Sequence, residues 1–178
     1  MTSLVLACFL IILNSCTSIE EKDSARFLSL ESVLKLMPEK SDQDSVQSSF
    51  GRPDIVMQID DSKDVAWIFK DLKTGYQRLA LVFNDQKKLQ SAVWMVSADE
   101  PEVNLENSQK RFPSAKFVAQ DAPWENPHAA PDERFYVDRE KGISITYRKT
   151  RKEVESISWF NPNSKQSSDR KPAVKYEL

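Results

Sequence analysis

The sequence predicts an α+β protein built from two short units, each with one or two helices packed against an antiparallel sheet. Two observations support this fold class. Short helical segments precede runs of strands that alternate apolar and polar residues, and turn residues separate these strands, which is the pattern of an antiparallel meander. This order of elements occurs twice along the 178 residues, a length sufficient for one or two small domains.

The first predicted unit covers residues 28–98. Apolar residues at helical spacing predict a helix between 28 and 37, and Pro38 cannot continue it. A second helix is expected from Ser41 to Phe50, because Gly supplies the left-handed turn that ends many helices and Gly51 follows directly. The expected strands cover residues 55–59, 65–70, 77–83 and 89–96.

The second predicted unit covers residues 99–160. It begins with a helix from about residue 105 to 112. A loop rich in Pro, Ala and Asn is expected at 121–133. The expected strands cover residues 116–120, 135–137, 143–147 and 154–160.

The two units correspond in the order of their residue types. Residues 45–50 match 107–112 at the end of a helix, the turn at 71–75 matches 138–142, and the strand at 89–94 matches 154–159, with Trp at the same place. We interpret this as a divergent internal repeat. The alternative is two unrelated meanders that share turn chemistry.

The N-terminus predicts export. Residues 4–13 are an unbroken apolar run, too short for a membrane-spanning helix, which needs about 20 residues, but suited to a signal peptide at 1–15. The run leads into Leu13-Asn14-Ser15-Cys16, which resembles the lipobox of bacterial lipoproteins. That resemblance implies that Cys16 becomes the first mature residue and carries palmitate-type acyl chains. The alternative is a buried N-terminal element with a free Cys16.

Composition narrows the class of protein further. Both cysteines lie at or before position 16, so the mature chain has no disulfide available although export would permit one. The net charge of −2 gives no electrostatic case for nucleic acid as a partner. Polar residues predict a tether at 16–27 and a disordered tail at 161–178.

The first unit also carries a family resemblance. Val46, the corner at Phe50-Gly51-Arg52-Pro53, Trp67 and the strand end at Leu81-Val82-Phe83 stand in the order found in SmpA/OmlA lipoprotein domains. The region of residues 41–83 therefore resembles the BamE-like fold. Two such units in tandem are similar in plan to secreted β-lactamase-inhibitor proteins, in which two sheets form a concave surface that grips a partner.

The chemical inventory predicts that the chain is not an enzyme and needs no cofactor or metal. His128 is the single histidine, so a metal site built from His and Cys is excluded, and the three Gly cannot form a phosphate-binding loop. The paired carboxylates at 60–61, 99–100 and 132–133 stand beside turns, where acidic residues are common. An enzyme that uses carboxylates alone stays an alternative.

Candidate partner-binding residues come from strand alternation. Trp94 and Trp159 are expected to cover the helix-facing side of the sheet. The opposite side would carry small, weakly polar residues suited to another protein or to solvent: Ser91, Val93, Met95, Ser144, Thr146, Ser156, Ser158 and Phe160. Trp124, in the predicted loop, is either a binding hot spot or a cover for the sheet.

These features together predict a lipid-anchored envelope protein that binds another protein, as an accessory in outer-membrane or envelope assembly. Thr17 rather than Asp after Cys16 favours the outer membrane, with the folded part facing the periplasm. The alternative is a secreted or anchored inhibitor of a hydrolase, for which residues 121–133 are the long candidate loop.

Overall fold

A computed structural model describes residues 28–59, 62–72, 74–121 and 131–163. The first half contains α1 (Leu30–Val33), α2 (Gln43–Phe50), β1 (Ile55–Gln58), β2 (Val65–Lys70), β3 (Gln77–Phe83) and β4 (Leu89–Met95). The second half contains the 3₁₀ helix η1 (Pro101–Val103), α3 (Leu105–Lys110), β5 (Val118–Asp121), β6 (Glu133–Asp138), β7 (Ile143–Arg148) and β8 (Glu153–Phe160).

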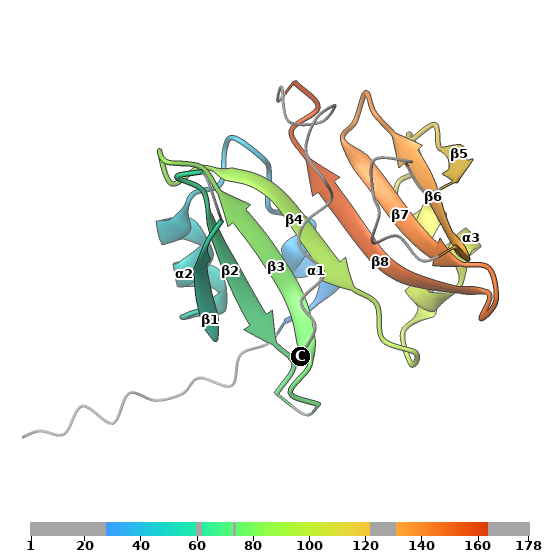
Figure 1. Cartoon of the computed structure of the whole chain (residues 1–178), viewed down its shortest axis with the longest axis horizontal. Coiled ribbons are helices and arrows are strands. Elements are labelled where there is room, and N and C mark those ends of the chain that lie inside the picture. Colours follow the sequence, from blue (N-terminus) through green and yellow to red (C-terminus); the bar gives the residue numbers. More distant parts are fainter. Residues whose placement is uncertain (1–27, 60–61, 73, 122–130, 164–178) are drawn as a thin grey trace, which may run out of the picture.

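All eight strands form one antiparallel sheet in the order β1-β2-β3-β4-β8-β7-β6-β5. The predicted α+β class, with few helices and an antiparallel sheet, is confirmed (Figure 1). Each half is a four-stranded meander, and the halves meet where β4 pairs with β8. The sequence predicts two sheets, whereas the structure has one. Pairing of the two final strands gives hydrogen-bond partners to backbone groups that separate sheets would leave at open edges.

The helices cover one face of this sheet. α1 and α2 lie behind the strands of the first half (Figure 1). Val33 of α1 and Val46 and Phe50 of α2 belong to the same hydrophobic core as the alternate residues of β2, β3 and β4. Phe50 meets Phe69 edge to face at 6.1 Å between ring centroids. Trp94 is fully buried in this core and Trp159 is 6% exposed, so the predicted core role of both residues is confirmed.

The second helix forms as predicted because both of its ends are capped. The Asp42 carboxylate accepts a hydrogen bond from the Ser45 backbone N–H at 3.0 Å, and the Ser45 hydroxyl group contacts the Asp42 backbone in return. Gly51 has a positive φ of 75° at the C-terminal end. The predicted corner at Phe50-Gly51-Arg52-Pro53 is therefore a helix end.

The first helix is shorter than predicted. It covers Leu30–Val33 instead of 28–37. Beyond Val33 the chain closes tighter turns, with hydrogen bonds from Lys35 N–H to Ser32 at 3.3 Å and from Leu36 N–H to Val33 at 3.0 Å. Pro38 disfavours the helical conformation in the residue before it, so the chain does not return to an α-helix before Pro38.

Two tight turns occupy equivalent places in the two meanders. The turn at 71–75 joins β2 to β3, and the turn at 138–142 joins β6 to β7. In each, an Asp carboxylate accepts a hydrogen bond from the backbone N–H three residues later, at 2.8 Å for Asp71 and 3.1 Å for Asp138. Each ends in a Gly with positive φ, 71° at Gly75 and 64° at Gly142.

Other predictions fall outside the described residues. These are Cys16 with the signal peptide and tether, Trp124 and His128 in the long loop, and most of the predicted tail. Within the ranges that the structure does describe, no helix is long and apolar enough to cross a membrane.

Candidate functional site

The strongest candidate site is the face of the sheet opposite the helices, where the two halves meet. We call it the seam face. It consists of Ser91, Val93 and Met95 of β4, Ser156, Ser158 and Phe160 of β8, and Ser144 and Thr146 of β7.

Strand pairing brings these residues together from sequence positions far apart. Val93 lies opposite Ser158, Ser91 opposite Phe160 and Met95 opposite Ser156. On the other side of β8, Ser158 pairs with Ser144 and Ser156 with Thr146. The predicted partner-binding residues Val93, Met95 and Phe160 therefore share one surface, which sequence alternation alone places on separate units.

The seam face differs in burial from the helix-facing side of the same strands. Along β4, the fully buried Ala92 and Trp94 alternate with the half-buried Val93 and Met95. Along β8, Ile157 is fully buried and its neighbour Ser158 is half-buried, whereas Ser156, on the same face as Ser158, is buried at 8% exposure. This alternation is typical of a sheet with one face in the core.

The chemistry of the seam face is uncharged. Five of its eight side chains carry a hydroxyl group, and the other three are apolar. Among the described residues, no hydrogen bond between these hydroxyls and another group is found. Apolar side chains border the face on both sides, with the buried Ala80 and Val82 next to β4 and the half-buried Phe135 and Val137 next to β7. The absence of charged side chains is the feature of this face that matches a protein interface, because charged residues are depleted at the core of such interfaces.

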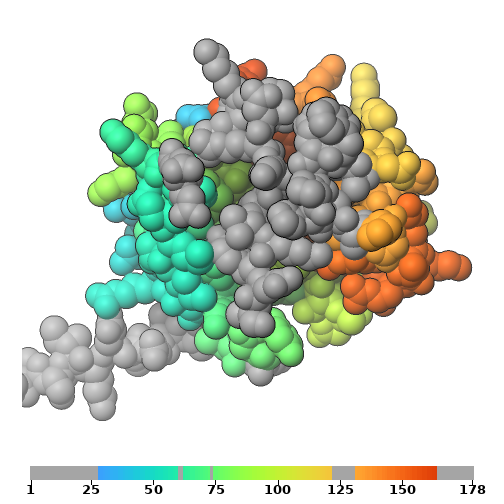
Figure 2. All heavy atoms as spheres, viewed as in Figure 1, coloured from blue at the N-terminus to red at the C-terminus, as the bar shows by residue number. Residues whose placement is uncertain are grey.

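Figure 2 shows the same side of the molecule in space-filling form, with the first half (cyan to green) and the second half (orange to red) on opposite sides of the view.

One end of the sheet carries an ion-pair network that sequence reasoning missed. Arg148 contacts Asp132, Glu133 and Glu155, each at 3.0 Å. The hydrogen bond from the Thr150 hydroxyl, together with the Arg148 guanidinium, holds the pKa of Asp132 below its ordinary value. Glu155 and the other carboxylates raise the pKa of Arg148.

This network changes the interpretation of the 132–133 carboxylate pair. The predicted loop extends to residue 133, but Glu133 begins β6 and pairs with Arg148 across the strands. A carboxylate with a lowered pKa that is bound to a guanidinium is a poor general acid near neutral pH. The geometry therefore gives these residues a structural role.

A second carboxylate, Glu100, is also engaged structurally. It forms an ion pair with Arg78 and accepts a hydrogen bond from the Ser97 backbone N–H at 3.1 Å. The Arg78 guanidinium carbon lies 4.0 Å from the centroid of the Trp94 ring. Residues 60–61, the remaining carboxylate pair, lie outside the described ranges.

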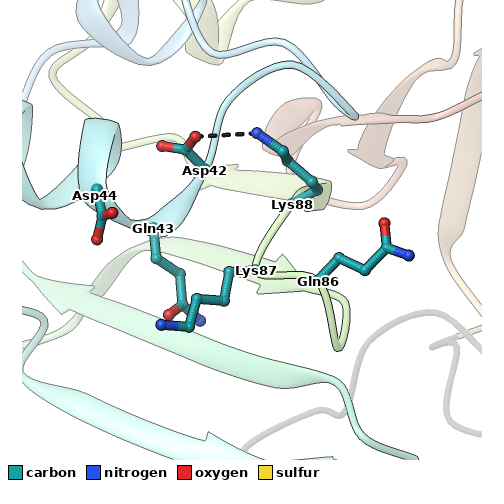
Figure 3. Close-up of a pocket in the computed structure, with 6 residues that line it drawn as sticks. All are labelled: Asp42, Gln43, Asp44, Gln86, Lys87 and Lys88. Atoms are coloured by element: carbon teal, nitrogen blue, oxygen red, sulfur yellow. Dashed lines mark hydrogen bonds and ion pairs between the residues drawn. The ribbon is translucent and has the colours of Figure 1, made fainter.

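The surface hollow in Figure 3 lies at the start of α2 and is also structural. It is lined by Asp42, Gln43, Asp44, Gln86, Lys87 and Lys88. Lys88 Nζ lies 3.0 Å from the Asp42 carboxylate, which also caps the helix. The Ser45 backbone N–H, followed by Lys88, lowers the pKa of Asp42 to about 2. Its carboxylate thus already has partners within the chain.

Residues that could hold a metal ion do not gather within the described ranges: no group of three or more His, Cys, Asp or Glu side chains with suitable placement is found there.

Comparisons with known proteins find only distant structural similarity. No protein-family model matches the chain, and no curated protein matches its sequence. Two solved structures are similar at low identity. A DUF4309 family protein (YjgB) from Bacillus subtilis has 13% identity and a TM-score of 0.49, covering 76% of this chain and 86% of its own.

The second structure is an extracellular protein containing a SCP domain, from Bacillus anthracis. It has 11% identity and a TM-score of 0.43, with 79% of this chain covered. The chain spans about half of that protein, 49% of its length.

Proposed function

We propose that the chain is an exported, lipid-anchored envelope protein that binds a protein partner through the seam face. Its anchor would be the acylated Cys16, and its folded part would face the periplasm from the outer membrane. The role follows the resemblance to BamE-like lipoproteins, an accessory in outer-membrane or envelope assembly.

The observation that carries the proposal is the composition of the seam face. It is continuous across three strands, it has no charged side chain, and hydroxyl groups outnumber apolar ones. Depletion of charge at the centre of a surface patch is typical of protein interfaces. Trp124 stays a predicted contact residue.

The proposed internal repeat would explain why the face lies at the junction. Equivalent Asp and Gly residues in the turns at 71–75 and 138–142 support a common origin of the two meanders. A duplicated unit that pairs through its last strand would create one composite surface from two copies of the same face.

The test is photo-crosslinking in cells from position 95 or 93. A photoreactive residue at Lys110, which is exposed on α3, is the matched control. We expect a specific adduct with an envelope-assembly component from the seam face and none from position 110. An adduct with a secreted hydrolase would instead favour the inhibitor alternative. Equal adducts from both surfaces, or none from the seam face, would contradict the proposed binding site.

A further inference from the structure

Two large apolar side chains lie exposed on one hairpin. Leu72 and Tyr76, on either side of the β2–β3 turn, are 67% and 68% exposed. Neither residue belongs to the seam face or to the hydrophobic core. Exposed apolar groups that occur close together, rather than singly, mark contact sites.

Hydrogen bonds join the described residues on the two sides of this turn. The Gly75 N–H donates to the Asp71 carbonyl at 2.8 Å, and the Asp71 N–H donates to the Tyr76 carbonyl at 2.8 Å. The Asp71 carboxylate accepts from the Thr74 N–H at 2.8 Å. Because this acidic group is turned into the loop, it opposes an apolar contact less than a free carboxylate would.

The shape of this site suits a lipid surface better than a protein groove. It is a projecting hairpin at one end of the sheet, and the start of the described chain (blue) lies toward that same end (Figure 1). Tyr is enriched at the headgroup level of bilayers, and Leu can enter the adjacent acyl region. An exposed Leu and an exposed Tyr on one hairpin match that layered environment.

The length of the chain before the structure permits this contact. Cys16 and Leu28 are 12 residues apart in the sequence. A chain of this length spans at most about 40 Å when fully extended. A compact domain of this size has a radius of gyration of roughly 14 Å. The end of the domain that carries the β2–β3 hairpin therefore stays within reach of the membrane that holds the lipid.

We propose that the side chains of Leu72 and Tyr76 insert into the interfacial layer of the bilayer that carries the Cys16 lipid. This inference rests on the proposed lipid anchor and adds a second membrane contact to it. The contact would orient the sheet so that β2 and β3 run away from the bilayer.

The experiment uses the full chain, processed in cells and reconstituted into phosphatidylethanolamine–phosphatidylglycerol vesicles. An environment-sensitive fluorophore is attached at L72C, with V118C as the matched control, since Val118 is 67% exposed on the far edge strand β5. Y76C serves as a second probe in case L72C alters the turn. Mass spectrometry of the same sample reports the acyl chains on Cys16.

We expect the emission of labels at positions 72 and 76 to shift to shorter wavelength. Nitroxide-labelled lipid should quench these labels several-fold more than the label at 118. Equal quenching at all three positions, with acylated Cys16, would overturn the inference and leave the anchor intact. An unacylated Cys16 would overturn the proposed function, and the hairpin contact would fall with it.

Discussion

Replacement of Gly142 by Ala should destabilise the protein much more than the same change at Gly75. Both glycines have positive φ, which costs a non-glycine residue about 1–2 kcal/mol. A Cβ at Gly75 would meet nothing within 4 Å, whereas a Cβ at Gly142 would lie 2.0 Å from the Phe160 carbonyl oxygen. The backbone must therefore shift where the Phe160 N–H donates to the Gly142 carbonyl at 2.8 Å.

The expected magnitudes follow from these two terms. Gly75→Ala should lose about 1 kcal/mol, because restriction of the unfolded chain offsets part of the strain. Gly142→Ala adds a steric term of about 1–3 kcal/mol, for a total near 3 kcal/mol. At about 4 °C per kcal/mol, the melting temperatures should fall by roughly 4 °C and 12 °C.

Urea denaturation followed by tryptophan fluorescence measures both variants, with Trp94 and Trp159 as buried reporters. Equal losses at the two positions, within about 0.5 kcal/mol, would refute the reasoning. They would mean that the end of β8 moves away from the turn without cost. Disturbance of Phe160 in Gly142→Ala should also weaken crosslinking from the seam face.

Three further predictions concern charge. Arg148→Met should lose about 1–2 kcal/mol at pH 7, a buried-pair cost reduced by partial exposure. Because the pKa of Asp132 is lowered from its ordinary value of 3.8, this loss should persist at pH 4 and shrink only at lower pH, while Lys110→Met, at an exposed pair, should show no measurable loss in urea denaturation. The pKa of Asp42 is lowered from 3.8 to about 2, so its charge stabilises the fold above pH 4 and this contribution disappears as the pH falls toward 2. Asp42→Asn should therefore melt below the wild type at pH 7, and a gap that persists at pH 2 would contradict this. Ser158→Arg should abolish crosslinking from position 95 with little change in melting temperature, since Ser158 is half-buried on the seam face, and an undiminished adduct would argue against this surface.

Local signals predict most of the elements. The strand alternation around Leu79 and Leu81 and the cap residues Asp42 and Gly51 act over a few residues, so the sequence alone reveals them. The seam-face residues follow from the same alternation. Glu133 shows the opposite case: its charge suggests a loop, but a distant Arg148 pairs with it and allows a strand.

Long-range pairing is what the sequence could not supply. No local pattern says that β4 meets β8, because that choice depends on which open edges remain after each meander has formed. The exposure of Leu72 and Tyr76 is likewise a property of the folded hairpin. Both residues are of types common at strand ends, and only the folded structure shows that their side chains are exposed.

The junction between β4 and β8 also sets an order of events during synthesis and folding. Val93 finds its partner Ser158 only 65 residues later in the chain. Until that segment arrives, β4 is a free edge beside a nearly complete meander, and a free edge can pair with a second copy. The chain is therefore most prone to aggregation before β8 pairs with β4. Rapid pairing of β8, or a chaperone bound at β4, would increase the yield of folded protein.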